Sequence, residues 1–307
     1  MTTALITHDA CYDHVTPNGH PEQVARLDAV LGALRDMDLL RVKAPLGAED
    51  DILLAHPKAH VNAIREAAPN SGWRSLDADT HMSVGTLEAA FRCVGGVTRA
   101  VDMVMGGEAK NAFVAMRPPG HHAERETPMG FCFFGNVAIA AKYAIAHHGL
   151  SRVAIVDFDV HHGNGTQDLV EDDARILFCS THQSPLYPGT GMAHEVGVDN
   201  VVNCPLPEGA GSKAFRDVMA RVVLPRVDAF APEILIISAG FDAHQADPLA
   251  GMNLTEDDFA WVTEKLCDLA DRHCKGRVVS SLEGGYDLVA LGASAAAHVT
   301  VLRERSE

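Results

Sequence analysis

The stretch that most constrains the fold is residues 152–165, RVAIVDFDVHHGNG. Residues 153–156 form an unbroken apolar run, which predicts a strand buried on both faces of a parallel sheet. Asp157, Asp159 and His161 then alternate, so in an extended chain their side chains share one face. Such groups resist burial unless a cation neutralises them, and Asp and His are normal zinc ligands. We therefore favour a metal site here over a solvated strand end.

Strands and helices are expected to alternate along the chain of 307 residues. Strands are predicted at residues 4–7, 112–116, 153–156, 175–180, 233–239 and 277–282, and helices at 22–37, 58–68, 85–105, 134–148, 166–170, 214–230, 255–273 and from 288 onward. Residues 73–83 are expected to be irregular, and Pro225 is expected to kink its helix. This alternation predicts a three-layer α/β/α fold with a mainly parallel sheet. No linker or repeat divides the sequence, so we expect a single domain over residues 1–307.

Composition indicates which binding partners and which cellular location to expect. The formal net charge of −16 argues against direct binding of nucleic acid. Seven cysteines, an odd number without a Cys-x-x-Cys pair, predict reduced thiols and a cytoplasmic location. Neither a signal peptide nor a membrane-spanning apolar run is visible, so no membrane partner is expected. The sequence leaves the oligomeric state open, a homo-oligomer included.

Most of the chemically distinctive residues follow the predicted carboxyl end of a strand, where open α/β sheets place their sites. Asp242 follows the 233–239 strand, and we predict that it joins Asp159 and His161 as a third metal ligand rather than only capping the next helix. Three protein ligands leave one coordination position open, as in catalytic zinc sites. The same donor set also suits Fe²⁺, so the sequence does not decide between the two metals.

Three further side chains are candidates for acid/base and oxyanion chemistry. His121 and His122 follow two prolines and a glycine, a stiff loop that fixes both rings. Because imidazole titrates near neutrality, an adjacent pair beside a metal predicts general acid/base catalysis. Asp157 is predicted to orient one of these imidazoles. Tyr286 follows two glycines and could stabilise an oxyanion; considered alone, it would be an ordinary surface tyrosine after a turn.

Several motifs together resemble the zinc-dependent histone deacetylase family, which includes the acetylpolyamine amidohydrolases and shares the arginase-like α/β fold. The motifs are RPPGHH at 117–122, GFCFF at 130–134, DFDVHHGNGTQ at 157–167, SAGFDA at 238–243 and EGGY at 283–286. The similarity begins at HPE, residues 20–22, and extends almost to the end of the chain. The family implies hydrolysis of an acetyl or similar acyl group from ε-acyl-lysine of a protein or peptide, releasing acetate and a free amine.

The resemblance also implies individual roles. Asp159, His161 and Asp242 would bind zinc, His121 and His122 would be the acid/base pair, and Tyr286 would polarise the substrate carbonyl. Gly130, Phe131 and Tyr187 would line the acyl-lysine tunnel, with Leu249 at its rim and Arg26 in an inner acetate pocket. Main-chain oxygens of Asp157, Asp159 and His161, together with Ser180, would hold a structural potassium ion.

The subtype can be predicted as well. Asn164 stands where class I deacetylases have an aspartate, and residues 164–167 resemble class II enzymes. Asn164 also argues against arginase-type chemistry, which needs extra carboxylates to bridge two manganese ions. Leu249 stands where the polyamine-selective class II enzyme has an acidic gatekeeper, which favours acyl-lysine over acetylpolyamines. Tyr187 replaces the commoner phenylalanine and would make the tunnel more polar. An acetylpolyamine or other small-amide hydrolase is the alternative, and a non-catalytic acyl-lysine binding scaffold is a remote one.

Overall fold

Eight strands form one central sheet in which every neighbouring pair is parallel. The computed structural model describes residues 2–307, and the strand order is β2-β1-β5-β10-β9-β6-β7-β8. The strands are β1 (Thr3–Thr7), β2 (Leu40–Lys43), β5 (Asn111–Val114), β6 (Val153–Asp157), β7 (Ile176–Gln183), β8 (Val201–Leu206), β9 (Ile234–Ala239) and β10 (Val278–Leu282). The α/β class and the mainly parallel sheet are therefore confirmed.

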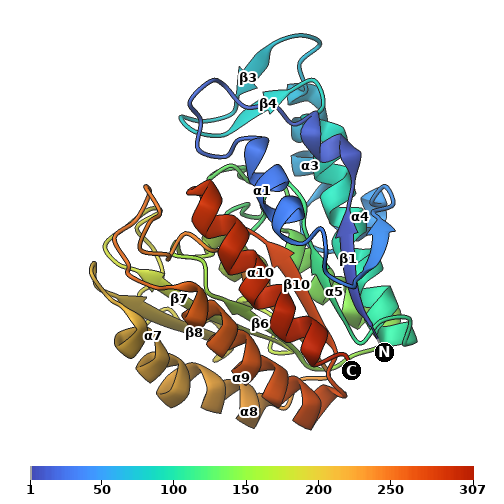
Figure 1. The fold of residues 1–307 in the computed structure, drawn as a ribbon. Coiled ribbons are helices and arrows are strands. Elements are labelled where there is room, and N and C mark those ends of the chain that lie inside the picture. The colour runs from blue at the N-terminus through green and yellow to red at the C-terminus, as the bar shows by residue number, and fades with distance from the viewer. Residues whose placement is uncertain (1) are drawn as a thin grey trace.

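Helices cover both faces of this sheet, which gives three layers (Figure 1). The helices are α1 (Ala25–Ala33), α2 (Glu49–Ile52), α3 (Lys58–Ala67), α4 (Thr86–Gly106), α5 (Asn136–His148), α6 (Asn164–Val170), α7 (Ser212–Val218), α8 (Leu224–Phe230), α9 (Glu256–Cys274) and α10 (Leu288–Glu304). Helices α4 and α5 share one hydrophobic core with the sheet, and α7 to α10 share the other.

Strand β6 shows why the sequence is apolar without interruption here. Val153 and Ile155 belong to the core on the α4–α5 side, whereas Ala154 and Val156 belong to the core on the α9–α10 side. Because alternate residues of a strand point to opposite faces, a strand covered on both sides needs an apolar residue at every position. All four of these side chains are fully buried.

The structure differs from the predicted elements in several places, among them the short helix α2, which was not predicted. Strands β2 and β8, at the two edges of the sheet, were absent from the prediction because their sequences mix apolar and polar residues and are partly exposed. The expectation that residues 73–83 are irregular is wrong, since β3 (Trp73–Ser75) and β4 (His81–Ser83) form an antiparallel hairpin. The 214–230 helix is interrupted by a π-helical turn, and Pro225 lies in the first turn of α8, where proline is tolerated.

The parallel arrangement places the carboxyl ends of four central strands side by side. Asp157, the last residue of β6, pairs in register with Ser180 of β7 and Ser238 of β9. Ser238 in turn pairs with Ser281 of β10, whose other neighbour is β5. The loops after these strands therefore all leave the sheet on the same side, at the carboxyl ends of the strands. Within residues 2–307, none of the helices combines the length and the apolar character that a membrane crossing requires.

Candidate metal centre and active site

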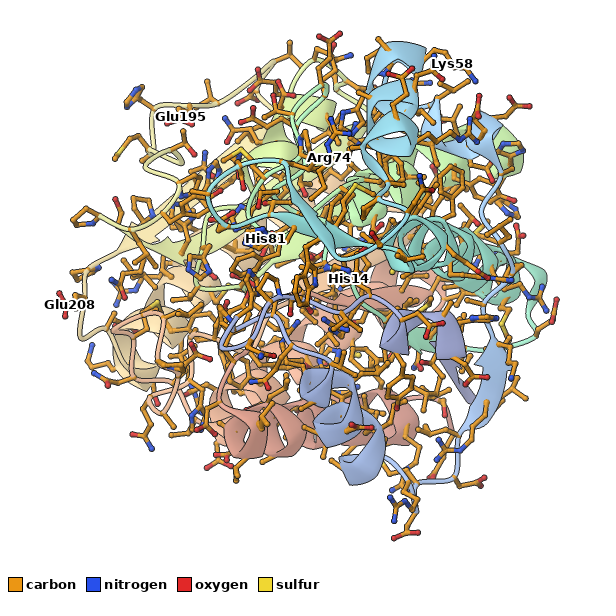
Figure 2. The ribbon with its side chains drawn as sticks, turned by 90° about the horizontal axis from the view of Figure 1, so that it is seen from above. His14, Lys58, Arg74, His81, Glu195 and Glu208 are labelled. Carbon is orange, nitrogen blue, oxygen red and sulfur yellow. The ribbon has the colours of Figure 1, made fainter. Side chains whose placement is uncertain are left out.

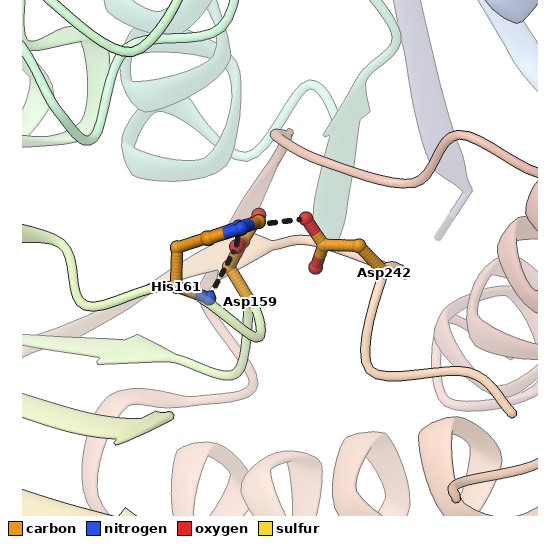
Figure 3. Close-up of side chains that lie close together, drawn as sticks. All are labelled: Asp159, His161 and Asp242. Carbon is orange, nitrogen blue, oxygen red and sulfur yellow. Dashed lines mark hydrogen bonds and ion pairs between the residues drawn. The ribbon is translucent and has the colours of Figure 1, made fainter. Parts of the chain in front are cut away.

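Asp159, His161 and Asp242 meet at this edge of the sheet. One donor atom from each residue lies within 4.8 Å of the other two, and all three residues are buried. His161 Nδ1 lies 3.1 Å from Asp159 Oδ1 and 3.2 Å from Asp242 Oδ2 (Figure 3). The first two residues come from the loop after β6 and the third from the loop after β9. The structure thus brings together the three residues that the sequence proposed as ligands.

The donor chemistry fits a divalent cation. Two carboxylates supply two negative charges, and one imidazole nitrogen completes a set of O and N donors of the kind that zinc and iron(II) accept. Backbone amides orient the carboxylates: Gly284 N donates to Asp159 Oδ2 at 2.8 Å, and Val160 N donates to Asp242 Oδ1 at 2.9 Å. A side chain at Gly284 would collide with Asp242, so glycine is required for this close approach.

His121 lies among carboxylates. Its Nδ1 is 3.0 Å from Asp157 Oδ2, and its Nε2 is 3.8 Å from Asp159 Oδ2. Burial by itself lowers the pKa of His121, but the charges of Asp159 and Asp157 outweigh burial and raise the pKa well above its ordinary value. Burial also raises the pKa of Asp157, to about 6. As predicted from the sequence, Asp157 is in position to orient an imidazole.

His122 has an uncharged partner instead. Its Nδ1 lies 2.7 Å from Asn164 Oδ1, while Asn164 Nδ2 donates to Glu124 Oε1 at 2.8 Å. Because the amide nitrogen is committed to a carboxylate, Asn164 can only accept from His122, which puts the imidazole proton on Nδ1. Burial, followed by the positive charges of His121 and His161, holds the pKa of His122 well below its ordinary value. Its Nε2 is left as a free base.

Tyr286 closes the site from the β10 side. Its ring packs against the Arg26 guanidinium, 4.8 Å from the ring centroid. Burial raises the pKa of the Tyr286 phenol well above its ordinary value, so the hydroxyl stays protonated and can donate a hydrogen bond. The residue is 8% exposed, which excludes the alternative of a surface tyrosine after a turn.

A cavity of about 230 Å³ opens above these groups. It is lined by Asp79, His122, Gly130, Phe131, His161, Leu186, Tyr187, Leu249 and Tyr286. The predicted wall residues are therefore assembled around one space, and Tyr187 meets His122 edge-on with ring centroids 5.2 Å apart. The β3–β4 hairpin, on which Figure 2 labels Arg74 and His81, carries Asp79 between its strands.

Arg26 is not among the residues that line this cavity. Its guanidinium lies behind Tyr286, fully buried, and donates to Gly285 O at 2.6 Å, Glu283 O at 2.5 Å and Glu22 Oε1 at 2.9 Å. In this structure Arg26 therefore holds the backbone that presents Tyr286.

Several residues that support the site carried no predicted role. Glu283 Oε2 accepts from Gly120 N at 2.7 Å and from His121 N at 3.1 Å, which fixes the loop of the two histidines. Glu22 accepts two hydrogen bonds of 2.6 Å from Arg117. Glu22, Arg117 and Glu283 are charged residues inside the motifs at 20–22, 117–122 and 283–286, and this was the sequence signal that could have pointed to their supporting role. Asp79 and Leu186 were also missed, and Asp79 lies in a segment without periodicity.

Ser180 lies on β7 directly beside Asp157 on β6. Its hydroxyl is 2.9 Å from His182 Nδ1, and Asp157 Oδ1 accepts from Asp159 N at 3.0 Å. Asp157 and Ser180, two of the residues proposed for a structural potassium ion, are therefore neighbours on adjacent strands, and Asp159 follows shortly after β6.

Comparisons with known proteins agree with this arrangement. The model of the histone deacetylase domain matches residues 20–302. A probable deacetylase of Archaeoglobus fulgidus is 37% identical over 298 residues, covering 94% of this chain and 82% of that protein. The histone deacetylase-like amidohydrolase of Pseudomonas aeruginosa is 40% identical over 272 residues, covering 87% and 71%. The crystal structure of the HDA15 HD domain superposes with a TM-score of 0.94 at 35% identity, covering 99% of this chain and 89% of that one. The chain belongs to the histone deacetylase family and has its arginase-like fold.

Proposed function

We propose that this chain is a zinc-dependent deacylase that hydrolyses ε-acyl-lysine in proteins or peptides, releasing acetate or a similar carboxylate and the free amine. The observation that carries the proposal is the joint placement of a three-residue cation site, a neutral buried imidazole and a protonated phenol around one cavity. We further propose that residues 1–307 act as one catalytic domain in the cytoplasm.

Asp159, His161 and Asp242 would hold the Zn²⁺, and Fe²⁺ suits the same donors. When bound, the ion supplies a Lewis acid that makes water more acidic and polarises an amide carbonyl. Ser180 with the main-chain oxygens of Asp157, Asp159 and His161 is our proposal for a structural potassium ion.

The protein's own groups then have separate tasks. His122, which lines the cavity and has a free Nε2, takes a proton from the attacking water as the water oxygen bonds to the acyl carbon. His121, kept positive by Asp157 and Asp159, stabilises the negative charge that develops. The Tyr286 hydroxyl donates to the oxyanion. As the carbon–nitrogen bond breaks, the proton on His122 passes to the leaving amine.

The cavity walls support an acyl-lysine substrate. Phe131 and Tyr187 offer aromatic faces to an aliphatic chain, and Leu249 leaves the rim on its side without charge. A second candidate substrate is an acylated polyamine, because Asp79 brings a carboxylate to the same cavity. Asp77 stands beside it and accepts from Asp79 N at 3.0 Å. Such a carboxylate pair would attract the remaining ammonium groups of a polyamine.

The test is a comparison of purified zinc-loaded protein on fluorogenic acetyl-lysine peptides and on acetylspermidine. We expect turnover of the peptides at the higher kcat/KM, whereas preference for acetylspermidine would support the second candidate. Asp242→Ala should lose both metal, measured by elemental analysis, and activity. If the zinc-loaded protein binds acyl-lysine peptides yet hydrolyses neither class of amide, the chain is a binding scaffold.

Tyr286→Phe provides the first quantitative prediction. It keeps the ring but removes the donor, so kcat should fall by about 10²–10³, the usual loss for one oxyanion donor. Metal content and melting temperature should stay close to those of the wild type, because no ligand and little apolar area is lost. Retention of more than about half of the wild-type kcat would exclude the oxyanion role.

A further inference from the structure

The loop of residues 283–287, which presents Tyr286, is held from several sides by groups outside it. Arg26 binds the carbonyls of Glu283 and Gly285, and Asp159 binds the amide of Gly284. Gly285 has φ +120°, a conformation that glycine adopts far more readily than other residues. Two consecutive glycines give the loop little stiffness of its own, so these external hydrogen bonds fix where the phenol stands.

Asp247 binds the backbone amide of Tyr286 itself. It lies in the loop between β9 and α9 and is 7% exposed. Its Oδ2 accepts from Tyr286 N at 2.6 Å and from Asp287 N at 3.3 Å. Its Oδ1 accepts from Leu249 N at 3.0 Å. One buried carboxyl group therefore binds the backbone of two residues, Tyr286 and Leu249, that both line the same cavity.

We propose that Asp247 is a positioning residue for the reaction, which sets the place of the Tyr286 hydroxyl and ties the Leu249 rim to it. The inference rests on the proposed function through the role of Tyr286. Three backbone amides converge on this one buried side chain, so the contact restrains the loop at Tyr286 and the rim at Leu249 together. A displacement of about 1 Å at a reacting group can cost about 10²-fold in rate.

Substitution by asparagine breaks this arrangement in either side-chain orientation. The two side chains have nearly the same shape, but one oxygen becomes an NH₂ group, which donates and cannot accept. With the NH₂ toward Tyr286, the amides of residues 286 and 287 lose their acceptor. With the NH₂ toward Leu249, the amide of the rim residue loses its acceptor instead, and Tyr286 is held by a weaker neutral bond.

The test is a double-mutant cycle with Asp247→Asn, Tyr286→Phe and the combined variant. Asp247→Asn should lower kcat by roughly 10–100-fold with a much smaller change in KM, at unchanged zinc content. In the Tyr286→Phe background the same substitution should cost less than about threefold, because its effect passes through a hydroxyl that is already absent. Equal losses in the two backgrounds, or a loss that follows the melting temperature, would overturn the proposal.

A matched control and a second readout complete the design. Glu233 Oε2 also accepts two backbone amides, from Ser151 at 2.7 Å and Arg152 at 3.0 Å, at the opposite end of the sheet. Glu233→Gln should leave kcat unchanged. Hydrogen exchange of the peptide 283–290 should be faster in Asp247→Asn than in either the control or the wild type. Hydrogen exchange can be measured whether or not the protein is active. Unchanged exchange in Asp247→Asn would therefore refute the positioning role, and this result is distinct from a failure of the proposed function, in which the wild type itself would show no activity.

Asp247→Glu covers the case in which the asparagine variant does not fold. This variant keeps the carboxyl group, but the added methylene moves both oxygens. Hydrogen exchange of 283–290 should therefore become faster and kcat should fall. A folded Asp247→Glu variant with wild-type kcat and exchange would count against the proposal.

Discussion

His121 and His122 are neighbours whose ring centroids lie 4.0 Å apart, yet their surroundings are opposite. The first meets the carboxylates of Asp157 and Asp159, and the second meets the amide of Asn164. Burial disfavours the charged form of both rings, but only His121 has charges that reverse the effect. The comparison teaches that the surrounding carboxylates, present around His121 and replaced by an amide at His122 Nδ1, shift the pKa values of two identical side chains in opposite directions.

A single segment provides this division. Asp157 is the last residue of β6 and Asn164 the first residue of α6, so the turn between them supplies both partners along with two of the proposed ligands. The positive ring is fixed beside the cation site, and the neutral ring faces the cavity. Asp and Asn at these two positions therefore determine which histidine can act as a base.

The largest expected effect comes from removing each ring in turn. His122→Ala should lose about 10²–10⁴ in kcat, the usual contribution of a general acid or base, because the other imidazole that lines the cavity, His161, is a proposed metal ligand. His121→Ala should lose less. Steady-state kinetics on an acetyl-lysine peptide, with metal content measured for each variant, decides between them. A greater loss in His121→Ala at full metal occupancy would reverse the assignment.

Exchanging the partners is expected to have a smaller effect. Asn164→Asp places a negative charge beside His122 and raises its pKa, so the acidic limb of the kcat/KM profile should move to higher pH. Asp157→Asn removes a charge from His121 and lowers its pKa, and kcat should fall by roughly 10–100-fold, as for other residues that orient a site. The pH profiles of both variants would be recorded beside that of the wild type. An unmoved acidic limb in Asn164→Asp would contradict the role of His122 as the base.

The sequence predicted the parts of this site that depend on local patterns. The apolar run at 153–156 located β6, but the strand ends at Asp157, so Asp159 and His161 stand in a loop rather than on one face of an extended chain. The edge strands β2 and β8 were missed because β2 is only four residues long and mostly exposed, and β8 has Asn203 and Pro205 among its apolar residues. Parallel topology then brought Asp242 to the same edge, as expected for strand ends.

Contacts between loops that are far apart in the sequence could not be predicted from such local patterns. Nothing around Asp247 shows that its carboxylate binds the amide of Tyr286, because the two segments meet only in the folded chain. The resemblance suggested an acetate-pocket role for Arg26, which stays a prediction, but it did not indicate that the guanidinium donates to the carbonyls of Glu283 and Gly285. Asp79 lies in a hairpin whose short strands carry no strong period.

The smallest expected effect concerns a third buried imidazole, that of His298. Because no carboxylate within residues 2–307 contacts this ring, it tests how burial alone changes the pKa of an imidazole. Its Nδ1 is 2.6 Å from Thr263 Oγ1 and its Nε2 is 2.8 Å from Ser280 Oγ. Burial alone lowers the pKa of His298 to about 3. The unfolded chain, with a pKa of about 6.5, binds the proton more tightly, so this contribution to stability is complete above pH 6.5 and is lost as the pH falls toward 3.

At pH 5 the loss from His298 should amount to about 2 kcal/mol of unfolding free energy, the linkage value for those two pKa values. His298→Gln keeps a hydrogen-bonding side chain but cannot titrate, so its unfolding free energy should fall less between pH 7 and pH 5 than that of the wild type. Urea denaturation at several pH values measures this slope directly. Parallel slopes would show that His298 is already charged in the folded protein, and that burial without carboxylates is not what keeps an imidazole, including that of His122, neutral.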